Sequence, residues 1–221
     1  MTLQGAVSKT AILLLLLVAA SGWTWGQMRA HPAYVAQWSL VWVIAGLVVG
    51  LTTVFKKSWA PVTAPIYAVV QGLLLGGISS LFELRYPGVV IQAVALTFGT
   101  LAALLIAYKS RLIQATQNFR LGVMAATGGI CLLYLVDLGM AFFGHRIPMI
   151  HESGMLGIGF SLFVVVIAAL NLVLDFDFIE QASQSEQAKY MEWYAGFGLL
   201  VTLIWLYMEI LRLLAKTSRR R

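Results

Sequence analysis

The sequence predicts an all-α membrane protein, a bundle of seven transmembrane helices. Its 221 residues are 60% hydrophobic and only 11% charged, whereas a soluble domain carries about 25% charged residues. The apolar runs are continuous rather than alternating, which indicates spanning helices and not the strands of a barrel. A span needs about 20 apolar residues. The chain therefore has room for seven spans and short loops, and we expect one transmembrane domain over residues 1–221.

The apolar runs are separated by short polar or turn-forming stretches. We place the spans at residues 10–28, 38–55, 65–84, 89–108, 121–143, 155–178 and 194–214. Because the connections are short, consecutive spans should lie antiparallel in one bundle.

The first two runs have the boundary residues of membrane helices. Trp23 and Trp25 in the first run are amphipathic aromatic side chains of the kind found at membrane interfaces. We therefore expect a retained helix rather than a cleaved secretory signal. The second run ends at Lys56 and Lys57. The net charge of +6 comes from basic residues that flank apolar runs, which favours contact with anionic lipid and argues against nucleic acid as a partner.

Small residues recur at helical spacing in the third and fifth runs, at Gly72-x-x-x-Gly76 and Gly122-x-x-x-Ala126. Such pairs let helix backbones approach closely in lipid. We interpret both as packing positions within the bundle and not as signs of a dimer.

Acidic residues inside the apolar runs are the strongest functional signal. A charge in hydrocarbon costs at least ~2.5–3.5 kcal/mol by insertion scales, so such residues usually line a polar path. Six of the nine acids lie in or at the edge of the runs: Glu83, Asp137, Asp175, Asp177, Glu180 and Glu209.

The sixth and seventh runs supply the candidate pH-sensing and ion-path residues. Asp175 and Asp177 are two residues apart on a helix and point in different directions, while Asn171 shares a face with Asp175. If either aspartate faces Glu209, the two carboxylates should share a proton and titrate together. When both are ionised, Asp177 and Glu209 would offer oxygen ligands to a transient Ca²⁺ ion.

Simpler interpretations stay open for the same acids. The segment 175–180 would then begin the polar loop after the sixth span, and Glu209 would pair with Arg212 at the interface. Asp137 and Glu83 are secondary intramembrane acids: we expect a hydrogen bond across helices for the first and an interfacial position for the second.

The sequence carries no motif of a hydrolase, a nucleotide-binding loop or an intramembrane protease, and its one cysteine, Cys131, lies in an apolar run. We therefore expect no enzymatic activity, no resident cofactor and no structural metal. Transient binding of Ca²⁺ or H⁺ is the remaining small-ligand chemistry.

Several segments in order resemble one known family. They are 64–68 with 71–78 (Ala-Pro-Ile-Tyr-Ala and Gln-Gly-Leu-Leu-Leu-Gly-Gly-Ile), 92–99, 108–111, 171–180 and 207–214. The chain resembles the Bax inhibitor-1 family (also called TMBIM, with the bacterial YccA branch), in its bacterial Bax-inhibitor-like subgroup. The resemblance covers roughly residues 9–216.

The resemblance implies a seven-helix bundle with the last helix central and a pH-sensitive calcium leak. In the family, acids on the sixth and seventh helices share a proton, and a basic residue after the second helix latches onto the first of them. Here these would be Asp175 or Asp177, Glu209, and Lys56 or Lys57. The chain departs from the family pattern in having Glu rather than Asp on the seventh helix and lysine rather than arginine as the latch. The segment between the two acids is also longer, by about two helical turns.

The same resemblance leaves a second function open. Relatives of the YccA type are associated with a membrane protease, so the alternative is a regulatory membrane protein that binds such a complex and transports nothing. In either case we expect an integral protein of a bacterial inner (cytoplasmic) membrane, with the lipid bilayer as its surroundings and an oligomeric state that the sequence leaves undetermined.

Overall fold

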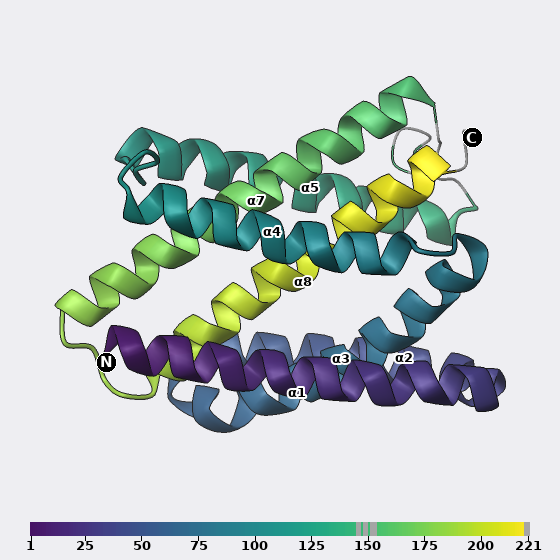
Figure 1. The fold of residues 1–221 in the computed structure, drawn as a ribbon, viewed down its shortest axis with the longest axis horizontal. Coiled ribbons are helices and arrows are strands. Elements are labelled where there is room, and N and C mark those ends of the chain that lie inside the picture. Colours follow the sequence, from purple (N-terminus) through teal and green to yellow (C-terminus); the bar gives the residue numbers. More distant parts are fainter. Residues whose placement is uncertain (145–146, 148–149, 151–153, 219–221) are drawn as a thin grey trace. The chain divides into compact units, whose positions relative to one another are not determined.

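The computed structural model describes residues 1–144, 147, 150 and 154–218. Figure 1 shows the helices in chain order, and no strand occurs among the described residues. The elements are α1 (Leu3–Ala30), α2 (Pro32–Phe55), the short 3₁₀ helix η1 (Lys57–Trp59), α3 (Ala60–Arg85), α4 (Val89–Lys109), α5 (Gln117–Phe142), α7 (Met155–Gln184) and α8 (Met191–Ser218).

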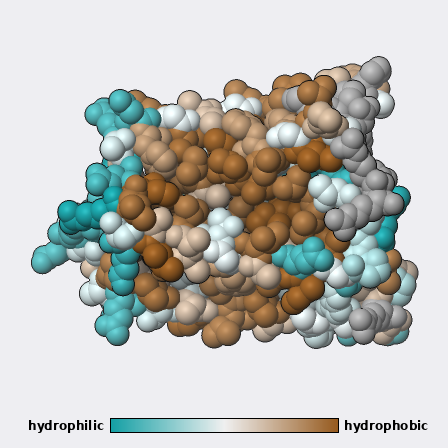
Figure 2. All heavy atoms as spheres, turned by 45° about the horizontal axis from the view of Figure 1, so that its top comes forward, coloured by the Kyte–Doolittle hydropathy of each residue, from teal (hydrophilic) through white to brown (hydrophobic). Residues whose placement is uncertain are grey.

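Seven helices in the described part of the chain are long and apolar enough to cross a membrane, which confirms the predicted fold class. The last helix, α8, is the most buried of them, with 50% of its most apolar stretch buried. Large apolar side chains such as Leu15, Leu47 and Leu132 are exposed, and hydrophobic residues cover most of the face seen in Figure 2. These are the surfaces that lipid would cover.

Several helices extend beyond the apolar runs that predicted them. The first helix begins at Leu3, where the Thr2 hydroxyl caps it by accepting a 3.0 Å hydrogen bond from the Gly5 amide. At the other end of the chain, α7 continues to Gln184. The interpretation of segment 175–180 as the start of a loop is therefore wrong, because these acids lie on an unbroken helix.

The chain divides into two compact units, and each is described by itself. The first contains Met1–Pro87 and Asp177–Val201, and the second contains Gly88–Phe176 and Thr202–Arg221. The boundaries fall inside α7 and inside α8. The single transmembrane domain expected from the sequence stays a prediction.

Glycines bring α1 and α3 together in the first unit. A Cβ atom at Gly72 would collide with the Leu17 carbonyl oxygen, and one at Gly76 with that of Ser21. The Ser21 hydroxyl, moreover, donates a 3.0 Å hydrogen bond to the Gly72 carbonyl oxygen. The Gly72-x-x-x-Gly76 pair is thus a packing notch, a place where the backbone of α1 lies directly against α3. At Gly122, by contrast, a Cβ atom would meet nothing within 4 Å.

The first turn of α8 is attached to the first turns of α1 in this unit. The buried Glu192 carboxylate accepts hydrogen bonds from the Thr2 amide (3.0 Å) and the Thr2 hydroxyl (3.1 Å). The Lys9 ammonium lies 5.0 Å from the centre of the Trp193 ring. A carboxylate is favourable at this place because the N-terminus of a helix carries partial positive charge.

The second unit has an apolar core between α5 and α7. Ile130 packs with Val164 and Ile167, and Tyr134, Phe160 and Trp205 pack around this cluster. The Tyr134 and Phe160 rings meet edge to face, with centroids 6.5 Å apart. This core fixes the position of Tyr134, whose hydroxyl belongs to the polar site described below.

The glycine notch predicts a stability difference between two kinds of glycine. Substituting Gly72→Ala or Gly76→Ala should lower stability by about 1–3 kcal/mol, because the added methyl group meets backbone that cannot move aside. Gly122→Ala is the matched control and should be neutral or slightly stabilising, because alanine has the higher helix propensity. Thermal unfolding in detergent measures both, and equal melting temperatures for the three variants would contradict the notch.

Candidate functional site

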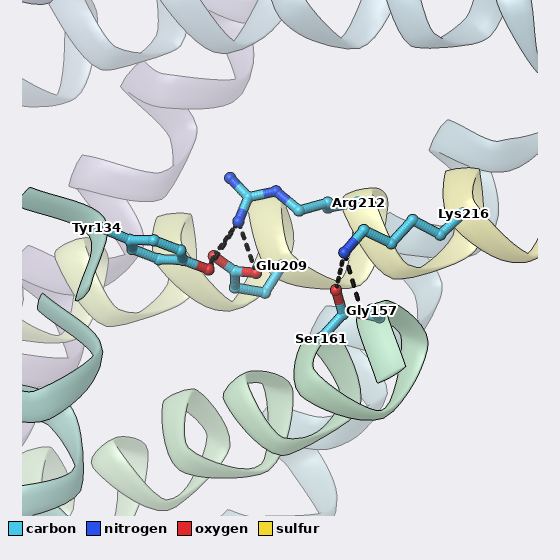
Figure 3. Close-up of polar contacts among 6 residues, drawn as sticks. All are labelled: Tyr134, Gly157, Ser161, Glu209, Arg212 and Lys216. Atoms are coloured by element: carbon cyan, nitrogen blue, oxygen red, sulfur yellow. Dashed lines mark hydrogen bonds and ion pairs between the residues drawn. The ribbon is translucent and has the colours of Figure 1, made fainter. Parts of the chain in front are cut away.

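A buried carboxylate on α8 is the centre of the candidate site, which lies entirely in the second unit (Figure 3). Only 2% of the Glu209 surface is exposed. Its Oε1 atom accepts a 2.9 Å hydrogen bond from the Tyr134 hydroxyl on α5 and a 3.0 Å bond from Arg212 Nη1. Its Oε2 atom accepts a 3.1 Å bond from the same nitrogen.

Arg212 completes a three-residue clasp with Glu209 and Tyr134. Its Nη1 atom also donates to the Tyr134 hydroxyl at 2.7 Å, and its guanidinium carbon lies 5.3 Å from the centre of the Tyr134 ring. The Arg212 side chain is 35% exposed. The clasp therefore joins α5 to α8 through one buried negative charge that is balanced by a cation partly open to its surroundings.

A second polar contact lies two helical turns beyond Glu209 on the same face of α8. The Lys216 ammonium is buried and donates to the Ser161 hydroxyl at 2.8 Å and to the Gly157 carbonyl oxygen at 3.0 Å, both on α7. Figure 3 shows the Lys216 side chain directed from α8 to these two atoms.

A third polar contact involves Asp175. Its carboxylate is hydrogen-bonded to the Thr202 side chain on α8, yet its Oδ2 atom is buried and has no partner in the described part of the chain. One turn earlier on α7, the Asn171 amide donates to the Thr127 hydroxyl on α5 at 2.8 Å. Asn171 also donates to the Ile167 carbonyl oxygen at 2.8 Å.

These contacts define the register of α7 against α8 in the second unit. Asp175 meets Thr202 at one end, and Ser161 meets Lys216 at the other, as expected for two antiparallel helices. Glu209 lies seven residues from Thr202, which is about 10 Å along a helix. Asp175 and Glu209 are therefore about two turns apart in level and have different hydrogen-bond partners.

A family model described as Bax inhibitor 1 like matches residues 1–219. The chain belongs to this family. The resemblance predicted from the sequence is thereby confirmed. The family and the seven apolar helices of the described residues indicate an integral membrane protein. No curated protein and no solved structure matches the chain.

The residues predicted as pH sensors fall in both units. Asp177 belongs to the first unit, where its Oδ2 atom accepts a 3.0 Å hydrogen bond from Gln181. Asp175 and Glu209 belong to the second unit. The carboxylate pair that the resemblance implies stays a prediction, as does the choice between Asp175 and Asp177.

The predicted latch residues lie after α2 in the first unit. Lys56 and Lys57 are both exposed, and the Lys57 ammonium lies 5.2 Å from the centre of the Tyr194 ring on α8. This cation–π contact is worth about 0.5–1 kcal/mol at an exposed position. A latch between either lysine and an acid stays a prediction.

The two secondary acids lie near helix ends. Asp137 Oδ1 accepts a 2.8 Å hydrogen bond from the Ile147 amide. Glu83 is partly exposed in the last turns of α3. Among the described residues, no group of three or more His, Cys, Asp or Glu side chains gathers to hold a metal ion.

Sequence reasoning missed five members of the polar contacts: Tyr134, Ser161, Lys216, Thr127 and Thr202. Lys216 had a usable signal, because Glu209, Arg212 and Lys216 follow one another at spacings of three and four and so share one helical face. Tyr134 and Ser161 had none, since a tyrosine or a serine in a long apolar run is common and its partner depends on tertiary packing.

The clasp predicts a stability cost for removing only its cation. Arg212→Met should lower stability by about 2 kcal/mol, because it leaves the buried Glu209 charge unpaired; the cost is reduced by the partial exposure of Arg212. Adding Glu209→Gln to Arg212→Met should restore most of the loss. Thermal unfolding of the single and double variants measures this, with Arg85→Met at an exposed position as the control. Strictly additive losses would contradict a coupled pair.

Proposed function

We propose that this protein is a pH-sensitive cation leak channel of the Bax inhibitor-1 type, with Ca²⁺ as the expected cation. The observation that carries the proposal is the Glu209 carboxylate, which is buried in a spanning helix and bound by Tyr134 and Arg212. A family of membrane proteins implicated in ion leak and an ionisable group inside the helices both favour this function over a purely structural role.

The proposed switch is the charge of Glu209. While Glu209 is ionised, the two bonds from Arg212 are charge-assisted, and α5 is held to α8 through Tyr134. Protonation of Glu209 removes this assistance and leaves a cation without its counter-ion. The clasp then loosens, and polar atoms between α5 and α8 become accessible to water and to a cation.

Asp175 is the second group that we propose to respond to pH. Its buried Oδ2 atom has no partner in the described residues, and a buried carboxylate in this state is costly unless it binds a proton, a water molecule or an ion. In one version of this response to pH, Asp175 shares a proton with Glu209, as the resemblance to the family implies. The different hydrogen-bond partners of Asp175 and Glu209 favour two separate groups over one shared pair.

We place the channel in the inner membrane of a bacterium, where a leak would act on the cytoplasmic cation concentration. A membrane protease or another membrane complex is the partner class that the alternative, non-transporting function would need. The transport experiment below separates these two functions.

Calcium flux into liposomes that hold the purified protein, measured across about pH 5 to 8, tests the proposal. The wild type should show a flux that changes with pH. Glu209→Gln should flatten that dependence, because glutamine keeps the hydrogen-bonding shape of the side chain and cannot change its charge. Glu186→Gln, at an exposed position after α7, is the matched control and should behave as the wild type.

Two further variants assign the acid of α7. Asp175→Asn and Asp177→Asn are compared in the same assay, and the residue whose substitution alters the pH profile is the responsive one. Background flux at every pH, with intact protein in the liposomes, would refute the channel and leave the non-transporting regulator as the better function.

A further inference from the structure

Lys216 is a buried cation whose partners are neutral oxygens. It is 6% exposed, and its ammonium binds the Gly157 carbonyl and the Ser161 hydroxyl. Among the described residues no carboxylate lies within ion-pair distance of Lys216: Glu209 is paired with Arg212 and acts on the Lys216 ammonium only at longer range. A buried lysine is usually paired with an acid because an isolated ammonium in a low-dielectric site is costly.

The two oxygens are ligands that also suit a free cation. Carbonyl and hydroxyl oxygens replace the hydration shell of small cations in channels and binding sites. Both atoms lie in the first two turns of α7 (Gly157 and Ser161) and face the last turns of α8. An ammonium group on a four-carbon stem is compact and can occupy such a site as a point charge.

We propose that the Gly157 carbonyl and the Ser161 hydroxyl form a binding site for small monovalent cations, which Lys216 occupies as a tethered cation. The side chain thereby blocks entry of free cations between α7 and α8 in this part of the protein. The role of the site as a block on the leak rests on the proposed function; the binding of a cation to it does not.

A structural role for Lys216 makes a different prediction from a blocking role. If Lys216 only holds α8 against α7, its removal lowers stability and leaves the leak unchanged. If it occupies a cation site, a small ammonium ion supplied from solution should replace it when the side chain is shortened.

The binding test uses Lys216→Ala and the probe propylammonium, with neutral propanol as the matched control. Propylammonium should raise the melting temperature of Lys216→Ala by about 2–4 °C, as expected for a ligand that binds only the folded protein. Propanol should not do so, and neither compound should stabilise the wild type, whose site is filled. Adding Ser161→Ala should reduce the effect of propylammonium.

The transport test uses Lys216→Met, which keeps the length of the side chain and removes its charge. The cation leak into liposomes should rise by about tenfold. The reason is that methionine cannot make the charged hydrogen bonds by which the Lys216 ammonium occupies the site. Lys109→Met, at an exposed position at the end of α4, should leave the leak unchanged. Propylammonium should reduce the leak through Lys216→Ala and not that through the wild type.

The outcomes separate the site from the channel. If propylammonium gives Lys216→Ala no stabilisation beyond that of propanol, the cation site is refuted. If it stabilises the variant while no protein shows a leak at any pH, the site stands and the proposed channel fails. If a wild-type leak is measured and Lys216→Met leaves it unchanged, the blocking role of Lys216 is refuted.

Discussion

The second unit depends on how one buried negative charge is balanced. Glu209 is buried, so the protein must supply hydrogen-bond donors to its carboxylate, and Tyr134 on α5 and Arg212 on α8 do so. Removing both charges of such a pair is often tolerated, whereas removing one is costly. We therefore expect the clasp to contribute little to the net free energy of unfolding. Its larger effect is to favour one arrangement of α5 against α8 over alternative arrangements.

Three polar contacts follow one another along α8 in this unit, two of them with α7 and the middle one with α5. Asp175 with Thr202, the clasp around Glu209, and Ser161 with Lys216 occur at intervals of about two turns, with apolar residues such as Leu206 and Leu211 buried between them. Each contact supplies a hydrogen bond or an opposite charge to a polar group that lipid could not solvate.

Composition and continuous apolar runs were sufficient to predict the fold class, because lipid allows few backbone solutions. Individual contacts were less predictable. The position of Glu209 inside a span could be read from its apolar neighbours, and Arg212 from its spacing of three residues. The Asp175 contact with Thr202, and the separation of Asp175 from Glu209, depend on the register of α7 against α8. The sequence pattern alone does not determine that register, because Asp175 and Asp177 fit the helical spacing equally well.

The close approach of α1 and α3 also limits how the first unit can move. Because Gly72 and Gly76 are seated against the carbonyl oxygens of Leu17 and Ser21, one helix cannot slide along the other by a small amount without a side chain meeting backbone. The next equivalent seating lies one helical repeat away, about 5.4 Å along the axis. We therefore expect α1 and α3 to resist small relative displacements. A rearrangement of this pair should shift one helix past the other by a whole helical turn rather than gradually.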